Sequence, residues 1–315
     1  MQRTYLLLAG LAMIHTAGAA TDSVDPPSPA NTTVFDTPVI VEAPEPRYVA
    51  PTLRDRIGRI WAPVLINGKG PYRLVLDTGA NSAALVPSVA HSLGIPIKES
   101  RQVQLHGVTG SAVVPMITLD TLEVGDLLIE DANVPIVADV FGGAEGVIGA
   151  KGLADKRIFI DFRNDQIRIE QSKGQVTPFG FTRVPLTLTR GQLLLMDIRI
   201  GSIRTHAIID TGAQQTLGNA SLREALVRRA RDGDPQTIIG VTLDVATGHS
   251  IRVPPISVGD LQIRNMNITF GDMFIFEQWK MTREPTVLIG MDVIGTLDTL
   301  IIDYHKREAL LRAHR

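Results

Sequence analysis

The stretch Leu74-Val75-Leu76-Asp77-Thr78-Gly79-Ala80 decides the fold, because it returns once as Ala207-Ile208-Ile209-Asp210-Thr211-Gly212-Ala213. Each copy is an apolar strand that ends in a carboxylate, followed by a hydroxyl group and by a glycine that allows a sharp turn. A lone Asp-Thr-Gly is weak evidence, because aspartate and glycine are ordinary turn residues. Two copies would bring two carboxyl groups together, so the pair predicts a site and not only a turn.

Further landmarks accompany the two copies in the same order, which indicates an internal duplication. Asp210 follows Asp77 by 133 positions (210 − 77). At similar spacing, five segments of the first half match segments of the second: Ile66-Asn67-Gly68 with Arg199-Ile200-Gly201, Val108-Thr109-Gly110 with Ala246-Thr247-Gly248, Val124-Gly125-Asp126-Leu127 with Val258-Gly259-Asp260-Leu261, Val147-Ile148-Gly149 with Leu288-Ile289-Gly290, and Phe159-Ile160-Asp161-Phe162 with Ile301-Ile302-Asp303-Tyr304. We therefore expect two copies of one β-rich unit.

With both Asp-Thr-Gly-Ala motifs and both later apolar-apolar-Gly elements, the sequence resembles the aspartic proteases of the retropepsin and pepsin group, in particular their bacterial, exported, two-lobed members. The resemblance covers about residues 60 to 312. It implies an all-β fold with short helices, in which two lobes are related by a pseudo-twofold axis. The active site would lie between the lobes, under a β-hairpin flap.

The resemblance also implies roles for particular residues. Asp77 and Asp210 would form the catalytic pair of an aspartic endopeptidase, which activates a water molecule and hydrolyses an extended polypeptide without a metal or cofactor. Four neighbours would support the dyad, the threonines by bracing the loops across the lobes and the glycines by donating backbone N–H groups: Thr78, Thr211, Gly79 and Gly212.

Two segments are candidates for substrate binding. Residues 103–114 predict a hairpin, and the resemblance makes it the flap, with Gly107, Val108, Thr109 and Gly110 at its tip. Residues 273–285 are extra in the second half and carry three aromatic residues: Phe274, Phe276 and Trp279. Apolar side chains of this kind belong to a core more often than to a substrate pocket, so both interpretations of the second segment stay open.

Two carboxyl groups at hydrogen-bond distance cannot both ionise cheaply, so the dyad should share one proton. Members of the group that work in acid compartments usually carry Ser or Thr after Asp-Thr-Gly, where the hydroxyl donates to the carboxylates. This chain has Ala80 and Ala213 instead. Without those donors the pair should keep its proton to higher pH, and we predict a mildly acidic to near-neutral optimum.

The N-terminal region predicts export. Residues 1–20 contain Arg3, an apolar run from residue 5 to residue 14 and small residues at 17–20, which is typical of a signal peptide. A membrane anchor is the alternative, but about ten apolar residues are too few for a hydrocarbon core that needs roughly 20. We expect a periplasmic or secreted protein without stable membrane insertion after cleavage. The Pro-rich residues 21–58 are predicted to be a tether or a removable pro-segment.

The rest of the chain divides into two predicted lobes, residues 59–172 and 186–315, joined by a connector at 173–185. Because one chain carries both aspartates, we expect a monomer, with no need for a homodimer of single lobes.

Composition excludes several other classes of protein. With 31 basic and 33 acidic residues the net charge is −2, which gives no reason to expect a nucleic-acid partner. The absence of cysteine excludes disulfides, thiol catalysis and Cys-ligated zinc. No histidine pair has metal-ligand spacing, and no Gly-x-Ser-x-Gly nucleophile motif occurs. The remaining alternative is an inactive protein of the same fold that binds peptides or serves as a scaffold, because a fold does not fix a function.

Overall fold

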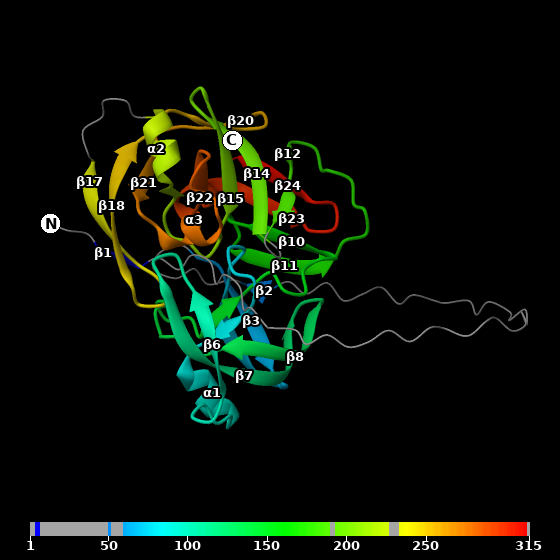
Figure 1. Ribbon diagram of the computed structural model, residues 1–315. Helices are drawn as coiled ribbons and strands as arrows, with labels where there is room; N and C mark the ends of the chain where they lie inside the picture. The colour runs from blue at the N-terminus through cyan, green and yellow to red at the C-terminus, as the bar shows by residue number, and fades with distance from the viewer. Residues whose placement is uncertain (1–3, 7–49, 52–58, 190–192, 227–232, 314–315) are drawn as a thin grey trace, which may run out of the picture.

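The computed structural model describes residues 4–6, 50–51, 59–189, 193–226 and 233–313. Within these ranges the chain is mostly β with short helices, which confirms the predicted all-β class. Figure 1 shows two β-rich lobes with a third sheet between them. Apart from residues 4–6 and 50–51, the predicted signal peptide (1–20) and tether (21–58) lie outside the described residues.

The first lobe is built on a sheet with the strand order β5-β9-β4-β3-β7-β6, and β8 also pairs with β7. Its strands are β3 (Trp61–Ile66), β4 (Lys69–Leu76), β5 (Ala84–Leu85), β6 (Arg101–His106), β7 (Ser111–Val124), β8 (Leu127–Pro135) and β9 (Gly146–Ile148). Helix α1 (Pro87–Leu93) follows β5. It ends at Gly94, which takes a left-handed conformation with φ of 76° that favours glycine.

The second lobe repeats this plan in a larger sheet, with the order β1-β17-β18-β21-β16-β22-β15-β14-β19-β20 and with β13 beside β14. Its strands are β1 (Thr4–Leu6), β13 (Thr187–Thr189), β14 (Leu193–Ile200), β15 (Ile203–Ile209), β16 (Leu217–Gly218), β17 (Asp234–Ile239), β18 (Val245–Arg252), β19 (Ile256–Val258), β20 (Leu261–Ile263), β21 (Asn267–Gly271) and β22 (Thr286–Ile289). Its helices are α2 (Ala220–Leu226), α3 (Phe274–Gln278) and α4 (Met291–Ile294).

The third sheet, in the order β12-β24-β23-β10-β11-β2, joins the two halves of the chain. Its strands are β2 (Ala50–Pro51), β10 (Lys156–Asp161), β11 (Gln166–Gln171), β12 (Thr182–Pro185), β23 (Leu297–Asp303) and β24 (Glu308–Ala313). β10 of the first half runs antiparallel to β23 of the second, with Phe159 opposite Ile301. The last four residues of the predicted connector are strand β12, which pairs with β24.

Each aspartate follows a strand that has a parallel neighbour from the same lobe. β4 lies parallel to β9, and β15 lies parallel to β22. The backbone N–H of Asp77 donates to Ile148 over 2.9 Å, and that of Asp210 donates to Ile289 over 3.0 Å. The repeated apolar-apolar-Gly elements therefore hold the two aspartate strands in place.

The glycines of these elements are required by close packing against the loops that follow the aspartates. A Cβ atom added to Gly149 would lie 2.5 Å from the backbone oxygen of Ser82. One added to Gly290 would lie 2.6 Å from the backbone of Gln215. Both distances are shorter than real Cβ contacts, so only glycine lets the loop fold back onto the strand.

One of the sequence matches between the halves is wrong by one residue. The two-residue turns are closed by the pair Ile66 and Lys69 in the first lobe and by the pair Ile200 and Ile203 in the second. Ile66 is therefore equivalent to Ile200 and not to Arg199. The cause is a bulge opposite the stretch from Val64 to Ile66, where β4 has one residue more than β3. This extra residue makes β4 one residue longer than β15.

Side chains along the strands alternate between the core and solvent. On β14, Met196, Ile198 and Ile200 are buried while Asp197 and Arg199 are exposed, as expected for a sheet with one solvated face. Within the described ranges, no helix combines the length and hydropathy needed to cross a bilayer.

Candidate active site

The structure brings Asp77 and Asp210 together at the centre of the molecule. Each lies in the turn directly after its strand, β4 or β15, and only 2% and 0% of their surfaces are exposed. The two carboxyl groups lie close enough for each to shift the pKa of the other. Two equivalent turns from two lobes therefore form one buried pair of carboxyl groups.

The threonines of the two motifs connect the lobes through four hydrogen bonds. The Thr78 hydroxyl donates to the carbonyl of Ile209 over 2.7 Å, and the Thr211 hydroxyl donates to the carbonyl of Leu76 over 2.6 Å. Each threonine N–H also donates to the hydroxyl of the other threonine over 3.1 Å. The brace expected from the resemblance is thus present, and it is symmetric.

The glycines of the motifs have two functions in this geometry. Gly79 N–H donates to Asp77 Oδ1 and Gly212 N–H donates to Asp210 Oδ1, both over 2.9 Å. In addition, a Cβ atom added to Gly79 would lie 2.5 Å from the Asp210 carboxyl carbon, and one added to Gly212 would collide with the Asp77 carboxyl group. Each glycine therefore makes room for the aspartate of the opposite lobe.

Burial sets the electrostatics of the pair. Burial raises the pKa of Asp77 to about 6, although hydrogen bonds from Asp210 and Gly79 and the charge of Arg59 act in the opposite direction. Burial also raises the pKa of Asp210 well above its ordinary value, and the neighbouring Asp77 charge raises it further. Ionisation of one carboxyl group therefore disfavours ionisation of the other, so the pair holds a proton more tightly than two separate carboxyl groups would.

Two buried residues next to the dyad were missed from the sequence, Arg59 and Tyr304. Arg59 lies two residues before β3, and its Nη2 donates to the carbonyl of Phe141 over 2.7 Å. Tyr304 follows β23, and burial together with the Asp77 charge raises the pKa of its hydroxyl. The sequence could not have identified Arg59, because the bulge between Val64 and Ile66 shifts the strand register by one residue, and unbroken pairing from the turn at residues 67–68 would place residue 58 opposite Asp77.

The predicted flap is a hairpin whose tip contacts the second lobe. β6 and β7 pair from Arg101 to His106, and residues 107–110 form the turn. The carbonyl of Val108 accepts a hydrogen bond from Ile275 over 3.2 Å, and the Thr109 hydroxyl accepts one from Gly240 over 3.1 Å. The tip is therefore closed onto α3 and onto the turn between β17 and β18.

The second lobe has a matching hairpin, and this corrects another sequence match. Gly107-Val108-Thr109 is equivalent to Gly240-Val241-Thr242, at the same shift of 133 (240 − 107) that relates the aspartates. The earlier match to Ala246-Thr247-Gly248 is wrong, because those residues lie within strand β18. The two turns contact each other, since a Cβ atom on Gly107 would lie 3.1 Å from the Val241 side chain.

Residues 273–285 contribute mainly to an apolar cluster of the second lobe that the flap tip joins. Phe276 and Trp279 are buried in this cluster together with Val108 of the flap and Ala213 of the second motif. Phe274 is less buried, and its ring stacks on that of His106 with 5.8 Å between centroids. The core interpretation therefore holds for two of the three aromatic residues, while Phe274 lies at the flap.

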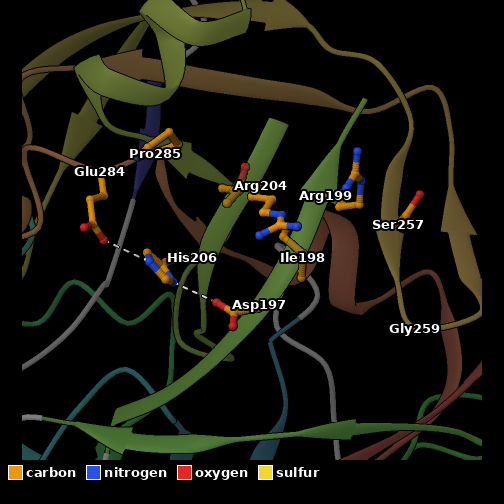
Figure 2. Close-up of a pocket in the computed structure, with 10 residues that line it drawn as sticks. Asp197, Ile198, Arg199, Arg204, His206, Ser257, Gly259, Glu284 and Pro285 are labelled. Atoms are coloured by element: carbon orange, nitrogen blue, oxygen red, sulfur yellow. Dashed lines mark hydrogen bonds and ion pairs between the residues drawn. The ribbon is translucent and has the colours of Figure 1, made fainter. Parts of the chain in front are cut away.

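A separate cavity of about 660 Å³ lies on the outer face of the second lobe and contains none of the predicted site residues. Figure 2 shows His206 between two carboxylates, with 2.8 Å to Asp197 and 3.0 Å to Glu284. Across the described part of the chain, no group of three or more His, Cys, Asp or Glu residues could hold a metal ion.

Comparison with known proteins identifies the family. The model of the aspartyl protease family matches residues 62–151 and 196–293, and the chain belongs to this family. The two matched regions contain Asp77 and Asp210 respectively. Among solved structures, the chain is similar to a retropepsin-like aspartic protease from Rickettsia conorii, with 18% identity, a TM-score of 0.31, and coverage of 41% of this chain and 96% of that one. No curated protein matches the chain.

Proposed function

We propose that the protein is an aspartic endopeptidase that hydrolyses an extended polypeptide at the Asp77 and Asp210 dyad. The observation that supports this most directly is the buried carboxyl pair, braced by Thr78 and Thr211 within one chain. A monomer therefore suffices for the chemistry, and we propose that it works as one. We also propose that it acts in the periplasm or outside the cell, on the strength of the N-terminal sequence.

The reaction needs no group beyond the dyad and water. The ionised carboxyl takes a proton from water while the oxygen of that water attacks the peptide carbonyl carbon. The protonated carboxyl gives its proton to the carbonyl oxygen, so a neutral gem-diol forms. The first carboxyl then protonates the amide nitrogen, the second recovers a proton from the gem-diol, and the C–N bond breaks to leave an acid and an amine.

The substrate is proposed to bind as an extended strand beneath the flap. The flap tip of the described structure is hydrogen-bonded to Gly240 and Ile275, so it has to lift before a polypeptide can enter. Once in place, an extended chain can satisfy the backbone groups of the hairpin while its side chains alternate between the two sides. Phe274, at the flap, is our candidate for contact with a substrate side chain.

The experiment is the incubation of the purified protein with an unfolded polypeptide, with the fragments identified by mass spectrometry. Asp77→Asn and Asp210→Asn should each abolish cleavage while they preserve the circular dichroism spectrum, because neither carboxyl can take both roles. A statine-type transition-state analogue should inhibit the wild type. Binding of the polypeptide without cleavage would support the scaffold alternative instead, and near-normal turnover in either folded variant would refute the dyad.

A further inference from the structure

The first lobe places a buried cation opposite its aspartate. The N–H of Leu76 donates to the carbonyl of Ile60 over 3.1 Å at the end of the antiparallel β3–β4 pair. One residue further on each strand, Arg59 and Asp77 lie opposite each other, and opposite residues of such a pair point to the same face. Arg59 is 0% exposed. Its guanidinium is held by the hydrogen bond to the carbonyl of Phe141.

The second lobe has an apolar residue at the equivalent place. β14 and β15 pair Leu195 with Ile208, and continuation of this register places Leu193 opposite Asp210. Leu193 is buried in the apolar cluster of the second lobe that the flap tip joins. One aspartate therefore faces a guanidinium group and the other faces a hydrocarbon side chain.

A second difference between the lobes also lies near Asp77. Tyr304, at the end of β23, is buried within electrostatic range of Asp77. The residue equivalent to Tyr304 in the repeat is Phe162. The groups that face Asp77 from the elements around it are thus Arg59 before β3, Tyr304 after β23 and Asp210 after β15.

We propose that Arg59 fixes the position of the shared proton, so that Asp77 is the carboxylate that activates water and Asp210 is the carboxylic acid that polarises the substrate carbonyl. This inference rests on the proposed function, because it divides the two roles of the dyad between named residues. A positive charge in a region without water stabilises the nearest carboxylate. The directions of the pKa shifts agree, since Arg59 lowers the pKa of Asp77 while the pKa of Asp210 is raised by burial and by the Asp77 charge.

Each proton transfer of the reaction can then be assigned to one of the two aspartates. Asp77 takes a proton from water and Asp210 gives one to the carbonyl oxygen, so the two residues have exchanged states when the gem-diol has formed. When the C–N bond breaks, Asp77 protonates the leaving nitrogen and Asp210 recovers the hydroxyl proton. Arg59 touches neither water nor substrate in these steps, so it is a positioning residue.

The test separates the charge of Arg59 from its shape. Arg59→Gln keeps a donor for the Phe141 carbonyl but removes the charge, and Arg59→Lys keeps the charge. Each is combined with Asp210→Asn, which leaves Asp77 to titrate, and with Asp77→Asn, which leaves Asp210. Carboxyl ¹³C NMR titration of the free protein gives the pKa in each case. The control is Arg73→Gln, because Arg73 is an exposed cation on β4, the strand that leads to Asp77.

We expect Arg59→Gln to raise the pKa of Asp77 by roughly one unit, since it removes a nearby opposite charge. The pKa of Asp210 should rise by much less, and Arg59→Lys and Arg73→Gln should leave both close to their starting values. In the intact dyad, Arg59→Gln should move the acidic limb of the kcat/KM profile to higher pH. Equal shifts at both aspartates, or none at Asp77, would overturn the proposal.

A measurement on the wild type covers the case in which Arg59→Gln does not fold. In mixed H₂O and D₂O at pH 7, the carboxyl carbon that bears the proton shows the larger isotope shift, and this should be Asp210. A larger or equal shift at Asp77 would refute the assignment. None of these titrations needs substrate, so they still decide the position of the proton if the protein fails to cleave polypeptides.

Discussion

Burial of the Asp77 and Asp210 carboxyl groups predicts that the folded protein becomes less stable as the pH rises. The pKa of Asp77 is about 6 in the folded state against an ordinary 3.8, so the folded protein binds this proton more tightly than the unfolded chain. The resulting stabilisation is complete below about pH 3.8 and is lost as the pH rises through 6. Asp210 has the same sign of shift.

This linkage predicts a pH-dependent effect of Asp210→Asn. The amide cannot ionise, so the variant should melt several degrees above the wild type at pH 8, with a gap that narrows towards pH 4. Calorimetry at a series of pH values measures the gap. A constant difference across the range would show that the substitution acts through packing and not through the buried charge.

The threonine brace gives a second prediction at the scale of single residues. Thr78→Val keeps the shape of the side chain, but it removes a donor to Ile209 and an acceptor for Thr211. Two lost hydrogen bonds with buried partners should cost roughly 2–4 kcal/mol in the free energy of unfolding. Thr211→Val should cost about the same, because its bonds mirror those of Thr78. Urea melts provide the measurement, and an unchanged midpoint in both variants would remove the brace as a source of stability.

At the scale of elements, the closed flap depends on one asymmetric contact. Thr109 accepts a hydrogen bond from Gly240 of the opposite hairpin, whereas its equivalent Thr242 bonds within its own turn, to Asp244 over 2.9 Å. Within the turns at residues 107–110 and 240–244, Thr109 therefore joins the two hairpins by a side-chain hydrogen bond, whereas Thr242 does not. Thr109 and Thr242 therefore allow a matched comparison. The substitution Thr→Val breaks a hydrogen bond between the lobes at Thr109 and a hydrogen bond within one turn at Thr242.

We predict that Thr109→Val leaves the Gly240 N–H only its longer hydrogen bond to the Asp244 carbonyl, at 3.3 Å, and so accelerates its exchange, whereas Thr242→Val does not. Hydrogen exchange followed by NMR reports this amide directly, and its exchange should accelerate about fivefold if a bond worth roughly 1 kcal/mol is lost. The KM for a peptide substrate should change in the first variant as well. Equal exchange rates in the two variants would show that the apolar contacts of Val108, and not this bond, keep the flap closed.

The elements also show what can be predicted from this sequence. The Asp-Thr-Gly-Ala repeat predicts the two lobes, because it marks a duplication. It also predicts that the aspartates meet, because each copy places a carboxyl group directly after an apolar strand of its own lobe. Arg59 and Tyr304 escape prediction, since their effect on Asp77 depends on a strand register and on a sheet shared between distant segments. The hairpin match was misplaced because Thr-Gly occurs both in the first turn and within β18.

At the scale of the whole molecule, the two halves share a sheet and cannot be independent domains. β10 and β23 pair over five residues on each side, and the Ser172 hydroxyl donates to the Asp303 carboxylate over 2.9 Å. The segment between β11 and β12 is exposed by contrast, with Phe179 97% accessible. We therefore expect the two halves to stay associated even when the segment between β11 and β12 is cut.

This predicts that the chain can be divided between Thr177 and Pro178. The two polypeptides should copurify when expressed together, because the β10–β23 ladder and the threonine brace hold them. Each expressed alone should be insoluble or unfolded, since it exposes a sheet edge and half of a buried site. Native mass spectrometry of the co-expressed pair measures the assembly. Recovery of both halves as separate folded species would contradict the shared core.

The space that each motif glycine leaves for the opposite aspartate limits how the duplicated gene can diverge. Elsewhere the two copies have drifted apart, with Arg59 against Leu193 and Tyr304 against Phe162. At Gly79 and Gly212 a single added methyl group in one copy would displace the acid encoded by the other. A substitution of either glycine therefore acts on the carboxyl group that the other half supplies. The two motifs are constrained together for this reason.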